Sequence, residues 1–378
     1  MSDTPIPPFT VQQNRFKLSP FYSCYAVADA QLGVYNRRLY AWTLGDDVAA
    51  AYQTLRTRAV LYDVPESPIA IVGPDAERLL DKALTRDMAK LRVGRAAYGL
   101  ACGPDGGILM DGVVLRLGPE RFLYVQADGE FQPWLAALGV GLDVTASDPN
   151  SWVLQVQGPR SLDILAAARD GGAPESFKYF DVLECALGGQ PVTVSRTGWT
   201  GEMGFEVYTQ ADTDGPALWR HLLSSGAEHG LINSGLDSMG IRRIEAGIID
   251  YGTDIDASMT PYQAGLGKFV DLSKPDFVGK QALEGADQRP LMFGLRCASA
   301  TPKRFAEVSR DNRVVGQITT SSWSPHLDCG VAFVRMAEPG DWLGAEVSVA
   351  APDGESLAAD IVSLPFYDPE KKIARGLT

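Results

Sequence analysis

The segment Thr197 to Tyr208, T-G-W-T-G-E-M-G-F-E-V-Y, places three glycines, a tryptophan, two carboxylates and a tyrosine in one predicted strand–turn–strand unit. The glycines allow a tight turn and a close approach of a flat ligand to the backbone. Side chains of the second strand alternate between its faces, so Phe205 and Val207 are predicted to enter a core. Glu206 and Tyr208 then point together into a cleft.

A cleft carboxylate at position 206 is suited to bind an amino-pyrimidine edge. Glu206 can accept two parallel hydrogen bonds from such an edge, and charge-assisted bonds of this kind are stronger than neutral ones. The alternative is an ordinary hairpin in which Glu206 lies in solvent. The segment alone does not decide between a pterin-binding strand and an exposed hairpin.

The composition indicates a globular protein of two or three domains. The 378 residues are 45% apolar and 21% charged, enough to bury one large core or several smaller ones. The formal net charge of -13 opposes binding to nucleic acid or to an anionic membrane surface. No apolar run approaches the roughly 18 residues that span a bilayer, and Met1 to Pro8 lacks signal-peptide features. We expect no nucleic-acid partner, no membrane association and a cytoplasmic location.

Cysteine and histidine are too scattered to indicate a metal site. The five cysteines include no C-x-x-C pair, and the three histidines show no H-E-x-x-H spacing. Asp250 to Asp256 is rich in aspartate but lacks the spacing and closing glutamate of a calcium loop. We therefore predict no metal, and we expect a carboxylate or a tyrosine to act as any acid or base.

The predicted elements before and after this segment form several layers. Strands at 98–102, 108–117 and 122–126 are predicted to form a meander. Asp111 lies in the middle strand, and it should face a cavity because an unpaired carboxylate in a core is costly; the alternative is an edge-strand aspartate in water. Helices are predicted over 46–60, capped by Asp46, and over 76–90. Beyond Asp287, short strands predict a small barrel or jelly-roll-like domain.

Aromatic residues are concentrated between Phe21 and Trp42. Tyr22 and its neighbours could line a pocket or hold a cation against their ring faces. Core packing is the alternative for most of them. The motif Val34-Tyr35-Asn36 is the exception, because an asparagine beside an aromatic residue favours recognition over packing.

Short motifs in a fixed order extend from about residue 34 to the C-terminal end. They are V-Y-N at 34–36, L-Y-D-V at 61–64, G-P-D-A at 73–76, G-G-I-L-M-D-G at 106–112, Q-G-P at 157–159, R-I-E-A-G at 243–247, D-Y-G-T-D-I at 250–255 and T-P-Y-Q-A-G-L-G-K-F-V at 260–270. With the opening segment, nearly the whole chain resembles the aminomethyltransferase family, which includes the glycine-cleavage T protein. V-Y-N, G-W-T and Y-G-T-D favour its dimethylsulfoniopropionate demethylase branch.

This resemblance implies an α+β fold, a three-domain cloverleaf with a central folate cleft. It implies two intertwined domains over residues 1–286, with an internal boundary near 150, and a barrel-like domain over 287–378. The implied cofactor is tetrahydrofolate, and Asp111 matches the family's catalytic aspartate. The expected folate contacts are Glu206, Trp199, Tyr208 and Tyr98, and the expected substrate contacts are Tyr35, Asn36, Tyr22, Trp199 and Tyr251.

Two positions depart from the glycine-cleavage pattern. V-P-E-S at 64–67 replaces the S-H-M-G that borders the folate and the aminomethyl carrier in T proteins. Met239 replaces an arginine, for which Arg242 and Arg243 are neighbouring substitutes or members of surface or capping salt bridges. These departures favour a donor other than the aminomethyl carrier of the glycine-cleavage T proteins.

The predicted function is therefore a tetrahydrofolate-dependent demethylase. It would act on a small methylated substrate: a sulfonium compound, a betaine or an aryl methyl ether. A glycine-cleavage aminomethyltransferase and a non-catalytic folate-binding protein are the alternatives. Association with further copies of the chain stays open.

Overall fold

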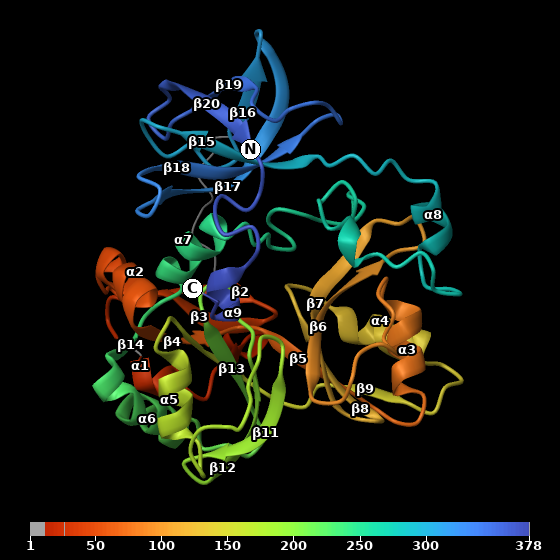
Figure 1. Cartoon of the computed structure of the whole chain (residues 1–378), viewed down its shortest axis with the longest axis vertical. Helices are drawn as coiled ribbons and strands as arrows, with labels where there is room; N and C mark the ends of the chain where they lie inside the picture. The colour runs from red at the N-terminus through yellow and green to blue at the C-terminus, as the bar shows by residue number, and fades with distance from the viewer. Residues whose placement is uncertain (1–11, 26, 378) are drawn as a thin grey trace.

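The computed structural model describes residues 12–25 and 27–377, which form three units around a central space (Figure 1). Met1 to Pro8, on which the signal-peptide prediction depends, lie outside the described residues. A barrel lies at the top of Figure 1, a six-stranded sheet with its helices at the lower left, and a five-stranded sheet at the right. The predicted α+β fold class is confirmed.

The six-stranded sheet contains the segment that opened the sequence analysis. Its strand order is β11-β12-β13-β10-β4-β14. The predicted alternation in β13 is confirmed, because Phe205 and Val207 pack in a core with Trp219 and Leu222. The strands are β4 (Ala59–Val64), β10 (Val153–Gln157), β11 (Val182–Leu187), β12 (Gln190–Ser195), β13 (Gly204–Thr209) and β14 (Leu231–Asn233).

Helices and a small sheet cover this unit. The helices are α1 (Tyr22–Tyr25), α2 (Val48–Thr57), α5 (Ser161–Ala168), α6 (Gly215–Gly226) and α7 (Asp237–Glu245), with short 3-10 turns η1 (Gln13–Arg15) and η2 (Ala227–His229). The small sheet joins β1 (Lys17–Leu18), β3 (Arg38–Thr43) and β2 (Gln31–Tyr35) in that order. The predicted cap of α2 was wrong by one residue. Asp47 accepts from the amides of Ala49 and Ala50, whereas Asp46 accepts from Ser234.

The five-stranded sheet is built from the chain between β4 and β10, so the first sheet is interrupted and later completed. Its strand order is β6-β7-β8-β5-β9, and the predicted meander of β6, β7 and β8 is confirmed. The helix predicted over 76–90 ends at Ala83, because Leu84 and Thr85 bond to the β6 backbone instead. Its elements are β5 (Ser67–Val72), β6 (Arg95–Cys102), β7 (Ile108–Gly118), β8 (Arg121–Gln126), β9 (Thr145–Ser147), α3 (Ala76–Ala83) and α4 (Phe131–Leu138).

The C-terminal strands close into a barrel in the order β15-β18-β17-β16-β19-β20, as the short-strand pattern predicted. They are β15 (Met292–Cys297), β16 (Glu307–Arg310), β17 (Arg313–Ser324), β18 (Cys329–Met336), β19 (Glu346–Ala350) and β20 (Ser356–Val362). The connecting elements η3 (Gly267–Phe269) and α8 (Lys280–Glu284) precede the barrel, and α9 (Lys372–Arg375) follows it. Among residues 12–25 and 27–377, no helix has the length and apolar character to cross a membrane.

Helix α7 joins the six-stranded unit to the barrel through buried ion pairs. Arg242 is fully buried and pairs with Glu202 at 2.6 Å and with Glu245 at 3.2 Å. Glu245 also accepts from Ser324 of β17 at 2.6 Å. A buried charge of this kind is stable only while its partner remains, because neither group is solvated.

We predict that Arg242→Ala lowers the free energy of unfolding by about 3 to 5 kcal/mol, because it leaves buried Glu245 without its cation. Arg160→Ala is the matched control, since its pair with Asp163 is half exposed and such pairs contribute only about 0 to 1 kcal/mol. Urea unfolding followed by circular dichroism measures both variants. Equal losses in the two variants would show that the α7 pair does not hold the units together.

Candidate functional site

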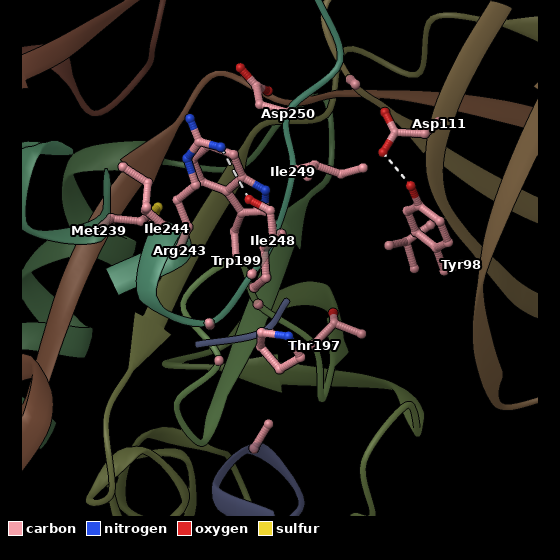
Figure 2. Close-up of a pocket in the computed structure, with 18 of the residues that line it drawn as sticks. Tyr98, Asp111, Thr197, Trp199, Met239, Arg243, Ile244, Ile248, Ile249 and Asp250 are labelled. Carbon is pink, nitrogen blue, oxygen red and sulfur yellow. Dashed lines mark hydrogen bonds between the residues drawn. The ribbon is translucent and has the colours of Figure 1, made fainter. Parts of the chain in front are cut away.

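A cavity of about 1960 Å³ lies where the three units meet. Its wall includes the ends of β4, β7 and β13, the residues after α7 and the segment after β20. Of the side chains predicted to form the site, the cavity is lined by Tyr35, Tyr98, Asp111, Trp199, Glu206 and Tyr251. Figure 2 shows part of this wall, with Asp111 and Tyr98 on one side and Trp199 on the other.

Glu206 is buried and held by four donors, so the exposed-hairpin alternative is wrong. Its Oε2 accepts from Tyr208 at 2.6 Å, from Ser195 at 3.3 Å and from the Thr197 hydroxyl. Its Oε1 accepts from Gln155 Nε2 at 2.7 Å. Burial raises the pKa of Glu206, and the three hydroxyl donors oppose that shift. Tyr208, predicted to enter the cleft as a folate contact, is 1% exposed and is not part of the cavity lining. It instead holds Glu206 in place through its hydroxyl group.

The glycines around Glu206 make room for a side chain of the protein. A Cβ atom at Gly198 or Gly204 would collide with the amide of Gln157. Gln157 in turn accepts from Thr200 at 2.8 Å. The predicted close approach to the glycine backbone is therefore made at these two positions by the Gln157 side chain and not by a flat ligand.

Glu66 is a cavity residue that the sequence analysis did not select. It follows β4, in the V-P-E-S segment that departs from the T-protein pattern, and that departure was the available signal. Its Oε1 lies 3.5 Å from Gln155 Nε2, the amide that also binds Glu206. Its Oε2 is buried and has no hydrogen-bond partner within the described part of the chain. Burial, and next the charge of Glu206, raise the pKa of Glu66 well above its usual value.

Asp111 and Tyr98 form a pair on neighbouring strands β7 and β6. The Tyr98 hydroxyl donates to Asp111 Oδ2 at 2.6 Å (Figure 2). Asp111 Oδ1 has no partner among residues 12–25 and 27–377. Burial raises the pKa of Asp111 to about 6, and the bond from Tyr98 opposes this rise. Asp111 is thus a carboxylate at neutral pH with one oxygen still open.

Tyr35 lies among carboxyl groups at the same end of the cavity. Burial raises its pKa, and the charges of Asp250, Asp111, Glu66 and Asp128 add to that shift in this order. Tyr251 lines the cavity after Asp250. The ring of Tyr98 packs against Phe269 with centroids 4.7 Å apart. Aromatic rings and carboxyl groups therefore lie together in this part of the wall.

Two predicted substrate contacts lie away from the cavity wall. Tyr22 packs in α1 against the core of the six-stranded unit, with its ring centroid 5.9 Å from that of Tyr25. Asn36 has a positive φ of 51° and occupies the turn between β2 and β3. Its Oδ1 accepts from Gln126 Nε2 at 3.0 Å and from the Gly129 amide at 2.9 Å. Asn36 therefore fixes the end of β8, and only its neighbour Tyr35 reaches the cavity.

The arginines proposed as substitutes at Met239 are already paired. Arg242 is enclosed by its two carboxylates. Arg243 binds Asp254 at 2.5 Å and the Ile248 carbonyl at 3.1 Å, and its guanidinium carbon lies 5.0 Å from the centroid of the Trp199 ring (Figure 2). One face of Trp199 is thus covered by Arg243. Both arginines are thus members of buried salt bridges, and not of the surface or capping salt bridges that were the predicted alternative.

The carboxyl groups do not converge as a metal site. In the part of the chain that the structure describes, no group of three or more His, Cys, Asp and Glu side chains is arranged to hold a metal ion. The open oxygens of Asp111 and Glu66 can each accept a hydrogen bond, or donate one when protonated.

Two family descriptions match the chain. The GCVT N-terminal domain matches residues 21–274, and the glycine cleavage T-protein C-terminal barrel domain matches residues 292–368. A crystal structure of the glycine cleavage system aminomethyltransferase T from Bartonella henselae superimposes with a TM-score of 0.84 at 28% identity, covering 93% of this chain and 98% of that chain. The first match includes the cavity strands β4, β7 and β13.

Curated relatives carry more than one name. An aminomethyltransferase of Saccharopolyspora erythraea is 34% identical over 84% of this chain and 89% of its own length. The heme-dependent oxidative N-demethylase gamma subunit of Ectopseudomonas mendocina is 32% identical over 95% and 98%. The trimethylamine-oxide aldolase of Ruegeria pomeroyi is 33% identical over 86% of this chain and 44% of its own length. The resemblance inferred from the ordered motifs is confirmed, and the chain belongs to the glycine-cleavage T-protein family of aminomethyltransferase-like proteins.

Proposed function

We propose that this protein moves a methyl group from a small methylated cation to tetrahydrofolate. The observation that carries the proposal is the pairing of two unlike walls in one cavity. One wall holds Asp111 with its open Oδ1 amid tyrosines and further carboxyl groups. The other holds Glu206, fixed by Gln155 and by hydroxyl donors. The first suits a cation, and the second suits the edge of an amino-pyrimidine.

The wall around Tyr35 supports a cationic donor. Asp250 and Asp111 lie close enough to raise the pKa of Tyr35, and burial raises the pKa of each of these carboxyl groups. A sulfonium or quaternary ammonium group would relieve the repulsion between the carboxylates. Ring faces add about 0.5 to 2 kcal/mol for each well-placed aromatic residue. Two relatives, an N-demethylase subunit and a trimethylamine-oxide aldolase, are named for methylated nitrogen compounds.

The residues around Glu206 fit tetrahydrofolate. Glu206 Oε2 accepts from Thr197 and Tyr208, with Ser195 farther away at 3.3 Å, but Oε1 has only Gln155. A carboxylate oxygen can accept about two hydrogen bonds, so Oε1 can still accept from a ligand N–H group. Trp199 offers the ring face that Arg243 does not cover. When bound, tetrahydrofolate would supply the nucleophilic nitrogen that accepts the methyl group.

Displacement at an activated methyl group requires little acid–base help from the protein. The carbon–sulfur or carbon–nitrogen bond breaks, and its electron pair leaves on a neutral sulfide or amine. The protein therefore aligns the reactants and excludes water. A base is still required for the proton that the accepting N–H group releases. Asp111 is suited to this role, because it is ionised above about pH 6 and has a free oxygen.

Aminomethyl transfer in glycine cleavage is a second candidate function. It is favoured by the aminomethyltransferase relatives, such as the one from Saccharopolyspora erythraea. It is opposed by Glu66 in the segment that replaces S-H-M-G and by the net charge of -13, which disfavours an acidic carrier protein. An assay with and without lipoyl carrier protein separates the two functions. Binding of tetrahydrofolate without turnover on any donor would favour the non-catalytic alternative.

We predict that kcat/KM for an onium donor falls about tenfold for each pH unit below about 6, because protonation of Asp111 removes the base. The pKa is raised from an ordinary value of 3.8, so the active carboxylate form lies on the alkaline side. Asp111→Asn should lower kcat by about 100-fold or more and abolish this acid limb. The measurement is a pH–rate profile with dimethylsulfoniopropionate and with glycine betaine.

An aryl methyl ether gives the opposite pH dependence and serves as the contrasting donor. Its leaving oxygen needs a proton, so Asp111 would have to be neutral and the rate would rise as the pH falls. Turnover of the ether with that acid-favoured profile, together with no turnover of onium donors, would contradict the cation proposal.

We also predict that Asp250→Asn raises KM for an onium donor by about 5- to 30-fold, the equivalent of roughly 1 to 2 kcal/mol of charge attraction in a partly solvated site. The affinity for tetrahydrofolate should change by less than about twofold, because Glu206 is held by its own donors and is not among the charges that act on Asp250. Asp212→Asn is the control, since Asp212 is exposed and remote from the cavity lining. An equal loss of folate affinity would place Asp250 in the folate site instead.

A further inference from the structure

Glu66 and Glu206 lie on either side of one amide. Strand β10 runs between β4 and β13, and Gln155 of β10 is in register with Glu206. Gln155 Nε2 lies 2.7 Å from Glu206 Oε1 and 3.5 Å from Glu66 Oε1. All three side chains line the same cavity. The amide therefore sets the spacing of the two carboxyl groups.

The two carboxyl groups differ in how many partners they have. Glu206 has four protein donors, including three on Oε2. Glu66 has one long contact on Oε1, and its buried Oε2 has no partner among the described residues. A buried polar atom without a partner is uncommon in native structures. Such an atom is expected to bind a ligand or to carry a proton. Hydrogen-bond donors of the protein thus stabilise the Glu206 carboxylate, whereas the Glu66 carboxyl group lacks such stabilisation.

The charged and titratable side chains that face Glu66 provide little positive charge next to its carboxyl group. They are Arg38 on β3, Asp111 on β7, Glu206 and Tyr208 on β13, and Tyr35 on β2. The cation among them, Arg38, donates to the Glu66 backbone carbonyl at 2.8 Å and covers the Trp152 ring at 4.1 Å. Burial and the charge of Glu206 raise the pKa of Glu66 well above its usual value. Two adjacent buried carboxyl groups cannot both ionise without cost, so the less supported one retains the proton.

We propose that Glu66 is a second folate-binding carboxyl group, which carries a proton and donates a hydrogen bond to an acceptor on the pterin edge, while Glu206 accepts from a neighbouring N–H group. The inference rests on the proposed function, because it takes tetrahydrofolate as the ligand. A 2-amino-4-oxo-pyrimidine edge presents N–H donors beside a carbonyl acceptor. A carboxylate next to a carboxylic acid is the complementary arrangement.

The test compares Glu66→Gln with Glu66→Ala. The glutamine amide keeps a donor of the same length but cannot ionise, whereas alanine removes the donor. Glu120→Gln is the matched control, because Glu120 is exposed in the turn between β7 and β8 and does not line the cavity. Tetrahydrofolate dissociation constants are measured anaerobically by calorimetry from pH 6 to pH 9, and thermal melting checks that each variant is folded.

We expect the wild-type dissociation constant to be flat at low pH and to rise at high pH, because deprotonation of Glu66 removes the donor and adds a second negative charge. Glu66→Gln should bind within about threefold of wild type and lose the alkaline rise, and Glu66→Ala should bind about 10- to 100-fold more weakly. Glu120→Gln should match wild type throughout.

Two results overturn the inference alone. If Glu66→Gln binds as weakly as Glu66→Ala, Glu66 acts as an ionised acceptor. If Glu66→Ala binds as well as wild type, Glu66 does not contact the ligand. A wild-type protein that does not bind tetrahydrofolate at any pH would overturn the proposed function as well, so the two failures are distinguishable.

Discussion

The cost of burying carboxyl groups is the constraint on which this structure depends. The cavity lining includes the carboxyl groups of Glu66, Asp111, Glu206 and Asp250, and burial raises the pKa of each of these four. The fold meets this cost by supplying neutral donors in place of cations: Tyr98 for Asp111, and Gln155 with three hydroxyl groups for Glu206. A carboxylate that is held by dipoles keeps its negative potential toward the cavity, whereas an ion pair would cancel it.

The two arginines of α7 differ from these carboxyl groups, because they are paired with groups of opposite charge. Arg242 and Arg243 in α7 are bound to a second set of carboxylates, namely Glu202, Glu245 and Asp254. Asp254 and Glu245 also accept from β17 side chains, so the same pairs join the barrel to the six-stranded unit. These two cations thus fix the units around the cavity, whereas Asp111 and Glu206 are held by neutral donors. The part of the wall around Tyr35 keeps the negative charge that the proposed cationic donor requires.

The family explains the scaffold, and the local departures from it indicate the chemistry. Relatives with different names share most of this chain, so the fold alone does not select a donor. What distinguishes this cavity is Glu66 beside Gln155 and Glu206, in a segment that the glycine-cleavage pattern fills with S-H-M-G. A charged or protonated carboxyl group at position 66 changes which ligand edges can form complementary hydrogen bonds with the cavity.

The sequence by itself determined the features that depend on neighbouring residues. Alternation along β13 placed Phe205 in the core and Glu206 in the cavity, because the side-chain period of a strand is two. The meander, the central position of Asp111 and the family followed from short motifs in order. The cap at Asp47 instead of Asp46 and the early end of α3 were missed, because a one-residue choice of hydrogen-bond partner is settled by packing.

The tertiary structure decided what depends on residues far apart in the chain. Glu66, Gln155 and Glu206 meet only because β10 inserts between β4 and β13 after the five-stranded sheet is complete. Tyr22 and Tyr35 are both aromatic residues of the N-terminal region, yet one packs in a core and the other reaches the cavity. Arg242 became structural because Glu202, 40 residues earlier in the chain, encloses it together with Glu245 of the same helix. Such pairings depend on strand order and helix placement, and local periodicity carries no information about either.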